Sequence, residues 1–79
     1  MKFINIGHEN SVNVDRIISI NNAKGKPIVR LIKNAKEEDK VIDSTEGNKT
    51  NSVILIDSGH LILSCHKVET LRRRICNAE

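Results

Sequence analysis

Residues 41–64 read VIDSTEGNKTNSVILIDSGHLILS, and this stretch predicts the centre of the fold. It holds a short run led by apolar residues at 41–44 and two apolar runs at 53–56 and 61–63, separated by two segments rich in turn-forming residues. The second of these segments is Asp-Ser-Gly-His, whose Asp and Gly are placed for a hairpin loop. We therefore expect three successive strands joined by short turns, of which the last two form an antiparallel hairpin.

The two later runs are continuously apolar, which is typical of strands buried on both faces. At 79 residues the chain is expected to form a single domain, residues 1–79, that buries only roughly 60% of its unfolded surface. Little material in one copy is then left to cover both faces. A second copy is the simplest cover, which predicts self-association. The alternative is that two short helices of the same chain cover the sheet.

Patterns outside this stretch complete the predicted domain. Polar and apolar residues alternate over residues 2–6 and 11–14, and an apolar run follows at residues 17–20, so we expect strands there. Pro27 is placed to open a first helix, and a second is expected over residues 68–77. The sequence thus predicts an α+β fold, with a small antiparallel or mixed sheet of about five short strands and two helices. The apolar face of the first helix is expected to consist of Ile28, Leu31, Ile32 and Ala35.

Composition and charge narrow the classes of partner. Lys and Arg number 13 against 10 Asp and Glu, and the formal net charge of +3 favours phosphate binding only mildly in one copy. A closed oligomer would repeat the same basic patch and add avidity. Phe3 is the only aromatic residue, so the stacking platforms of single-stranded nucleic-acid modules are missing. Because the sequence contains no secretory or membrane-spanning segment, we expect a cytoplasmic protein in which Cys65 and Cys76 stay reduced.

Nucleophilic and metal-binding residue types do not form a recognisable site in the sequence. Asp57, Ser58 and His60 are neighbours in one predicted turn, whereas a serine nucleophile needs its base and acid from separate elements. Cys65 and His66 are adjacent, so on a strand they point to opposite faces, and no Cys-x-x-Cys pair accompanies them. The four glycines are isolated and form no phosphate loop. We expect no enzymatic activity, no cofactor, no metal and no small-molecule substrate.

Basic side chains remain as candidate binding groups. Arg16 lies between two predicted strand segments and Lys49 lies in the turn after the first apolar run, and loop-borne cations of this kind are suited to clamping phosphates. Residues 72–74 are three arginines in the second helix, where they project to different sides. Their position near the helix C-terminus is equally explained by the helix dipole, so that alternative stays open. Lys24 and Lys26 add a basic loop.

Several motifs resemble those of the RemA family of bacterial extracellular matrix regulatory proteins. The matching segments keep the order and spacing of that family over nearly the full chain. They are FINIG at residues 3–7, DRIISI at 15–20, PI at 27–28, IDSTEG at 42–47 and VILIDSGHLILS at 53–64. Glu69 and Thr70 also fall where the family has Pro-Glu-Thr. The resemblance implies a small α/β protein that assembles into rings and binds DNA as a transcriptional activator of biofilm matrix genes.

The resemblance also implies which residues contact DNA. Arg16 matches an arginine before Ile-Ile, and Lys49 replaces one arginine of a loop that reads Gly-Arg-Arg-Thr-Arg in the family. Asn48 and Asn51 take the places of two other arginines, and Glu46 stands where the family commonly has Tyr. The loop has lost positive charge, so we expect weaker and less salt-dependent DNA binding, with the arginines of the second helix as a source of compensation. The expected DNA-contacting residues are Arg16, Asn48, Lys49, Arg72 and Arg73.

These expectations combine into one functional hypothesis and one alternative. The hypothesis is a homo-oligomeric transcriptional regulator that binds double-stranded DNA mainly through its backbone, with Arg16 and Lys49 of many copies on one rim. The alternative, favoured by the substitutions in the loop, is an oligomeric structural or adaptor protein that has lost DNA binding. Its protein partner would bind residues 46–51.

Overall fold

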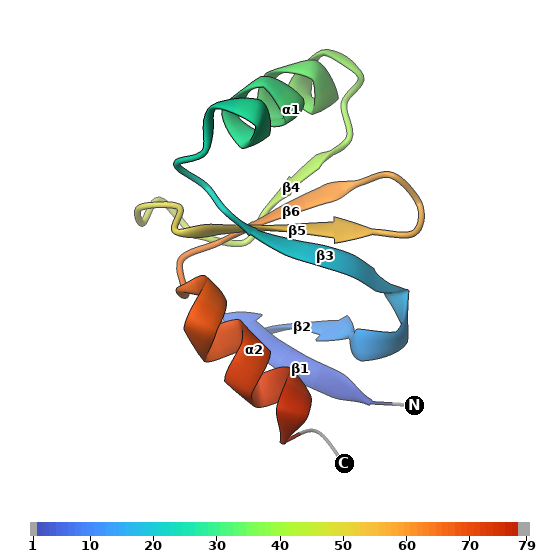
Figure 1. The fold of residues 1–79 in the computed structure, drawn as a ribbon, viewed down its shortest axis with the longest axis vertical. Coiled ribbons are helices and arrows are strands. Elements are labelled where there is room, and N and C mark those ends of the chain that lie inside the picture. Colours follow the sequence, from blue (N-terminus) through green and yellow to red (C-terminus); the bar gives the residue numbers. More distant parts are fainter. Residues whose placement is uncertain (1, 78–79) are drawn as a thin grey trace.

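The computed structural model describes residues 2–77, which form a four-stranded sheet, a two-stranded sheet and two α-helices (Figure 1). The predicted α+β class with two helices is confirmed, although six strands in two sheets replace the expected single sheet of about five. No helix in this part of the chain is long and apolar enough to cross a membrane. In chain order the elements are β1 (Phe3–Gly7), β2 (Asn10–Asn13), the 3₁₀ helix η1 (Val14–Arg16), β3 (Ile17–Asn22), α1 (Lys26–Glu37), β4 (Val41–Asp43), β5 (Ser52–Ile56), β6 (Leu61–Ser64) and α2 (Val68–Cys76).

The predicted hairpin forms the centre of the four-stranded sheet, whose strand order is β3-β5-β6-β4. β5 and β6 run antiparallel, with Leu55 opposite Leu61. The turn between them is closed by a hydrogen bond from the Ile56 N–H to the His60 carbonyl (3.2 Å). Gly59 in this turn has a φ of +88°, a conformation that glycine adopts without the steric cost of a Cβ. The expected antiparallel hairpin is therefore confirmed.

The first apolar run forms β4, but this strand does not lie beside the strand that follows it in sequence. β4 pairs in parallel with β6 and forms an edge of the sheet. Residues 44–51 connect β4 to β5 by passing the end of β6. Both ends of this connection bond to β6, because the Ser44 N–H donates to Leu63 O (3.1 Å) and the Asn51 N–H to Ser64 O (2.9 Å). The three successive strands form as expected, but the expected short turn between the first two is a connection of residues 44–51.

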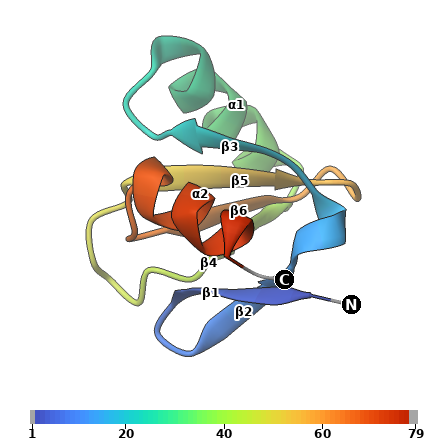
Figure 2. The ribbon, with the colours of Figure 1, turned by 60° about the horizontal axis from the view of Figure 1, so that its bottom comes forward.

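Both faces of the four-stranded sheet are covered by elements of the same chain (Figures 1 and 2). On one face α1 packs over the buried Val53 and Leu61. On the other face, α2 and the β1–β2 hairpin enclose Ile54, Ile62 and Leu71. Alternate residues of β5 and β6 thus enter two different cores, which explains why the runs are continuously apolar. The chain therefore needs no second copy to cover either face. The alternative of cover from the same chain is correct, with the β1–β2 hairpin in addition to the two expected helices.

The first helix forms as its sequence predicts, with one deviation. Gly25 is the N-cap of α1 and Pro27 lies in its first turn, where a missing N–H leaves no helical bond unmade. Ile28 and Ile32 pack against the core between α1 and the sheet, in line with the predicted apolar face. Leu31 does not join them and remains 39% exposed.

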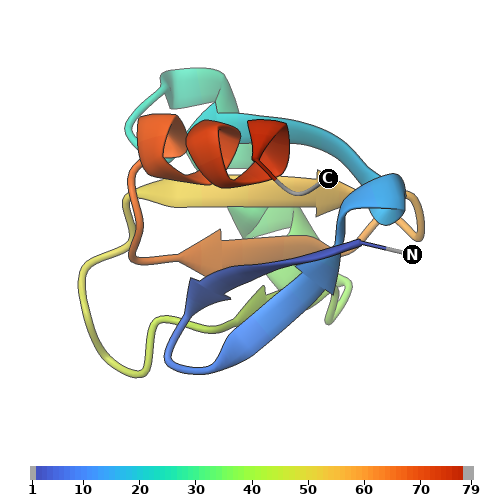
Figure 3. The same cartoon turned by 90° about the horizontal axis from the view of Figure 1, so that it is seen from below.

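The two-stranded sheet is attached to β6 by a buried hydrogen bond. The Ser64 hydroxyl donates to the Ile6 carbonyl at 2.7 Å, and both residues are buried. Gly7, with a φ of +122°, lies so close to the segment after β6 that a Cβ at this position would be 3.2 Å from the Cys65 Sγ. The β1–β2 turn and residues 65–66 consequently meet at the end of the sheet where the 44–51 connection also lies (Figure 3).

Candidate nucleic-acid interface

Arg16 is presented at one end of the four-stranded sheet. It ends η1, whose N-cap residue Asn13 accepts a hydrogen bond from the Asp15 N–H at 3.0 Å through its side chain. The Arg16 carbonyl accepts a hydrogen bond from the Asp57 N–H (2.9 Å). The Nη1 of the Arg16 guanidinium donates to the Asp57 Oδ2, also at 2.9 Å. The guanidinium side chain is nevertheless 66% exposed. Arg16 is therefore a positioned surface cation with one carboxylate beside it.

The 44–51 connection takes its shape from hydrogen bonds at its start. The Asp43 Oδ1 accepts from both the hydroxyl (2.6 Å) and the N–H (2.9 Å) of Thr45, and these bonds hold the pKa of Asp43 below its ordinary value. Gly47 has a φ of +85° and faces open space, so it supplies the turn that puts the tip of the connection outside the core. Lys49 follows this turn and is exposed.

The two asparagines of the connection are engaged within the fold. Asn48 donates through Nδ2 to the Thr45 carbonyl at 2.9 Å, and the same amide nitrogen lies 2.8 Å from the Nε2 of His8. Asn51 donates to the Cys65 carbonyl at 2.7 Å and so ties the connection to the segment before α2. At both positions the carboxamide shapes the loop, which leaves Lys49 as the cationic group of this segment.

The three arginines of α2 have different environments, as their consecutive positions on a helix predict. Arg74 is half-buried and its Nη1 donates to the Asn5 carbonyl of β1 at 2.7 Å, so it helps to attach α2 to the small sheet. Arg73 pairs with Glu69 one helical turn earlier (3.2 Å), and Arg72 is exposed. The structure thus leaves Arg72 and Arg73 at the surface and uses Arg74 for packing.

The predicted contact residues lie in three separate places within one chain. Arg16 is next to the end of β5, whereas Asn48 and Lys49 precede its beginning. Because five residues of strand span about 17 Å, these groups lie at opposite ends of the sheet. The arginines of α2 form a third group on the covering layer. One chain alone therefore does not bring Arg16 and Lys49 onto a common rim.

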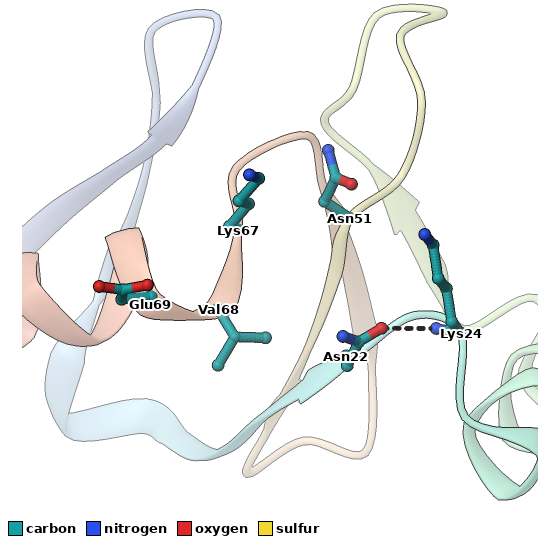
Figure 4. Close-up of a pocket in the computed structure, with 6 residues that line it drawn as sticks. All are labelled: Asn22, Lys24, Asn51, Lys67, Val68 and Glu69. Atoms are coloured by element: carbon teal, nitrogen blue, oxygen red, sulfur yellow. Dashed lines mark hydrogen bonds between the residues drawn. The ribbon is translucent and has the colours of Figure 1, made fainter.

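A cavity of about 300 Å³ lies at the end of the sheet that carries the 44–51 connection (Figure 4). Lys24 belongs to the basic loop predicted from the sequence, whereas Lys67 is a new member of the candidate site, because nothing in the local pattern relates these two positions. Only the tertiary fold brings them to one cavity. Its lining consists of Asn22, Lys24, Asn51, Lys67, Val68 and Glu69.

Ser58, His60 and Asp57, which are neighbours in sequence, do not form a hydrogen-bonded triad in the structure. The Ser58 hydroxyl lies 2.8 Å from the His60 Nδ1 within the β5–β6 turn, while Asp57 faces Arg16. His66 lies at the β1–β2 turn, where burial, followed by electrostatic interactions with Arg74 and His8, lowers its pKa. Among residues 2–77, no group of three or more His, Cys, Asp or Glu side chains is arranged to hold a metal ion.

Comparison with known proteins gives consistent matches over almost the whole chain. A family model described as "Extracellular matrix regulatory protein A-like" (RemA-like) matches residues 3–75. A protein of Geobacillus kaustophilus is 44% identical over 79 residues, which cover 100% of this chain and 91% of that protein. A protein of Finegoldia magna is 47% identical over 75 residues, or 95% of this chain and 90% of its own length. A protein of Bacillus cytotoxicus is 42% identical over 79 residues, with coverage of 100% and 91%. All three are named as regulatory proteins.

Proposed function

Because the chain belongs to the RemA-like family of extracellular matrix regulatory proteins, we propose that it regulates transcription by binding double-stranded DNA as a homo-oligomer. The regulatory class follows from its relatives, and the DNA ligand is our inference from the placement of its basic side chains. The family resemblance points to activation of biofilm matrix genes as the biological role. A DNA ligand also implies a cytoplasmic location.

The observation that carries the DNA-binding proposal is the setting of Arg16. Its backbone is held by η1 and by the bond to Asp57, so the guanidinium projects from a defined point. An exposed ion pair such as Arg16–Asp57 contributes only about 0–1 kcal/mol. A phosphate oxygen can therefore replace the carboxylate at little cost, and the planar guanidinium matches phosphate geometry.

Self-association would bring Arg16 and Lys49 of different copies together, which a single chain does not do. Arg16 and Lys49 lie at opposite ends of the sheet, so a head-to-tail arrangement would place Arg16 of one copy near Lys49 of the next. Such an interface is heterologous, and it produces a ring if the rotation between copies closes. The surface offers apolar groups for this contact, because five large hydrophobic side chains among residues 2–77 remain exposed. These are Phe3, Ile18, Val29, Leu31 and Ile42.

The experiment that tests the proposal is duplex binding by an Arg16→Ala variant. We expect affinity at low salt to fall about tenfold. The plot of log affinity against log salt should become shallower by about one unit, which corresponds to the loss of one phosphate contact. The matched control is Arg30→Ala, which removes the same charge from an exposed position of α1. Sedimentation should show the same assembly for both variants. Equal duplex binding by Arg16→Ala and Arg30→Ala would contradict the assigned role of Arg16.

The alternative of an adaptor without DNA binding is favoured by one observation in the 44–51 connection. The amides of Asn48 and Asn51 are used inside the fold, and the exposed carboxylate of Glu46 lies 3.8 Å from the His8 Nδ1. This segment therefore presents one lysine beside one acid. Retention on heparin separates the two functions, because an adaptor elutes at low salt whereas a multivalent DNA-binding oligomer requires high salt.

A further inference from the structure

We propose that Lys24 and Lys67 form a phosphate-binding site on either side of Asn51, and that this site takes the backbone of double-stranded DNA. The inference rests on the proposed function and assigns contact residues to the end of the sheet opposite Arg16. Lys24 comes from the loop between β3 and α1, and Lys67 from the loop before α2. Both line the cavity of about 300 Å³, in which their side chains extend in the same direction as that of Asn51 (Figure 4).

Hydrogen bonds fix the backbone of both lysines relative to Asn51. The Lys24 N–H donates to the Asn22 Oδ1 at 2.8 Å, and the Ala23 N–H donates to the Asn51 carbonyl at 3.3 Å. On the other side, the Asn51 amide donates to the Cys65 carbonyl, two residues before Lys67. The loops that carry the two ammonium groups are thus held together before any ligand arrives, which lowers the entropic cost of binding.

The charge distribution at this cavity favours an anion. Within residues 2–77, neither the Lys24 nor the Lys67 ammonium group makes a hydrogen bond or an ion pair. Glu69 is the one acidic residue in the lining, and it pairs with Arg73 at 3.2 Å. Two cations without partners beside a concave surface attract anions, and each ammonium group can donate to a phosphate oxygen.

The position of the site favours a polymer backbone over a small free anion. Both lysines are exposed, so the ligand remains largely in solvent, where two ammonium groups hold a single free phosphate weakly. A DNA strand gains from further contacts on the same molecule, and Lys49 is two residues from Asn51 on the same connection. Lys24, Lys49 and Lys67 then provide three phosphate contacts at this end of the sheet.

The test compares duplex binding by a Lys24→Gln/Lys67→Gln variant with that of a Lys33→Gln/Lys36→Gln control, which removes the same charge from exposed positions of α1. We expect the first variant to lose at least tenfold in affinity at low salt, and its plot of log affinity against log salt to become shallower by about two units. The control should change little. All four residues are exposed, so circular dichroism should show native folding in both proteins.

Each contrary outcome points to a different error. Equal binding by the two double variants, with Arg16→Ala still impaired, overturns this site and leaves the proposed function intact. Absence of duplex binding by the wild-type protein overturns the proposed function and this site together. A second arm titrates inorganic phosphate while backbone amide resonances are monitored. Saturation at Lys24, Asn51 and Lys67 that duplex DNA does not displace would assign the site to a small phosphate and overturn its role toward DNA.

Discussion

Arg16 and Asp57 form an ion pair that both positions the arginine and competes with its proposed ligand. The two groups are 2.9 Å apart, and the side chains of Arg16 and Asp57 are 66% and 45% exposed. The carboxylate orients the guanidinium at the end of the sheet, but it also repels an approaching phosphate. The net effect of Asp57 on DNA binding is expected to be inhibitory. An exposed ion pair contributes little stabilisation, so little is lost when the carboxylate is removed.

We therefore predict that Asp57→Asn strengthens duplex binding. The amide can still accept a hydrogen bond from Arg16, while the removal of one negative charge should raise affinity at low salt by about two- to tenfold. Fluorescence anisotropy with labelled duplex measures this change. Glu37→Gln on α1 is the control for a general change in net charge. If both variants gain equally, Asp57 has no specific influence on the Arg16 contact.

At the level of elements, the β1–β2 turn and the segment after β6 depend on each other. Gly7 lies against Cys65 and His66, and the Ser64 hydroxyl accepts from the His66 N–H at 3.2 Å while it donates to Ile6 O. Burial at this junction, and then electrostatic interactions with Arg74 and His8, lower the pKa of His66. The folded protein consequently prefers the neutral imidazole more strongly than the unfolded chain does.

This preference predicts that stability declines in mild acid. As the pH falls below the ordinary histidine pKa of 6.5, the unfolded chain takes up a proton before folded His66 does, so the free energy of unfolding decreases. The decline ends once the pH is below the lowered pKa of the folded state. Thermal melts in this range should show it for the wild-type protein and for His60→Gln, and a smaller decline for His66→Gln. An identical decline in all three proteins would contradict the assignment.

On the scale of the whole molecule, the chain covers its central sheet but leaves apolar side chains at the edges. β3 and β4 are the two outer strands, and each exposes an isoleucine, Ile18 at 63% and Ile42 at 46%. Outer strands also carry unpaired backbone groups that can pair with another chain. The proposed self-association therefore rests on these outer surfaces, since the cores on the two faces are complete without a partner.

We predict that Ile18→Glu weakens self-association without unfolding the protein. The side chain is exposed, so the free energy of unfolding should change by less than about 0.5 kcal/mol, whereas a buried charge at an interface is strongly unfavourable. Sedimentation velocity over a range of concentrations should show smaller species for this variant. Ser11→Glu, which adds the same charge on β2, is the control. Unchanged assembly of Ile18→Glu would place the interface elsewhere.

Local patterns in the chain were sufficient to predict the elements and several of their roles. The apolar runs around Asp57 and Gly59 predicted the hairpin, and Pro27 with its following apolar residues predicted α1. Arg16 was identified as a surface cation between strands, and it is one. Each of these features depends on turn chemistry or on residues close in sequence, which is why it could be read locally.

Tertiary packing decided the features that depend on contacts between distant residues. The parallel pairing of β4 with β6 and the cover on both sheet faces could not be predicted, because a continuous apolar run indicates burial without identifying what buries it. The presence of Lys24 and Lys67 at one cavity, and the separation of Arg16 from Lys49, likewise depend on how the strands are arranged in the sheet. Strand order is set by which apolar faces pack together most completely. The total apolar surface that is buried depends on the whole chain, so it cannot be predicted from any single segment.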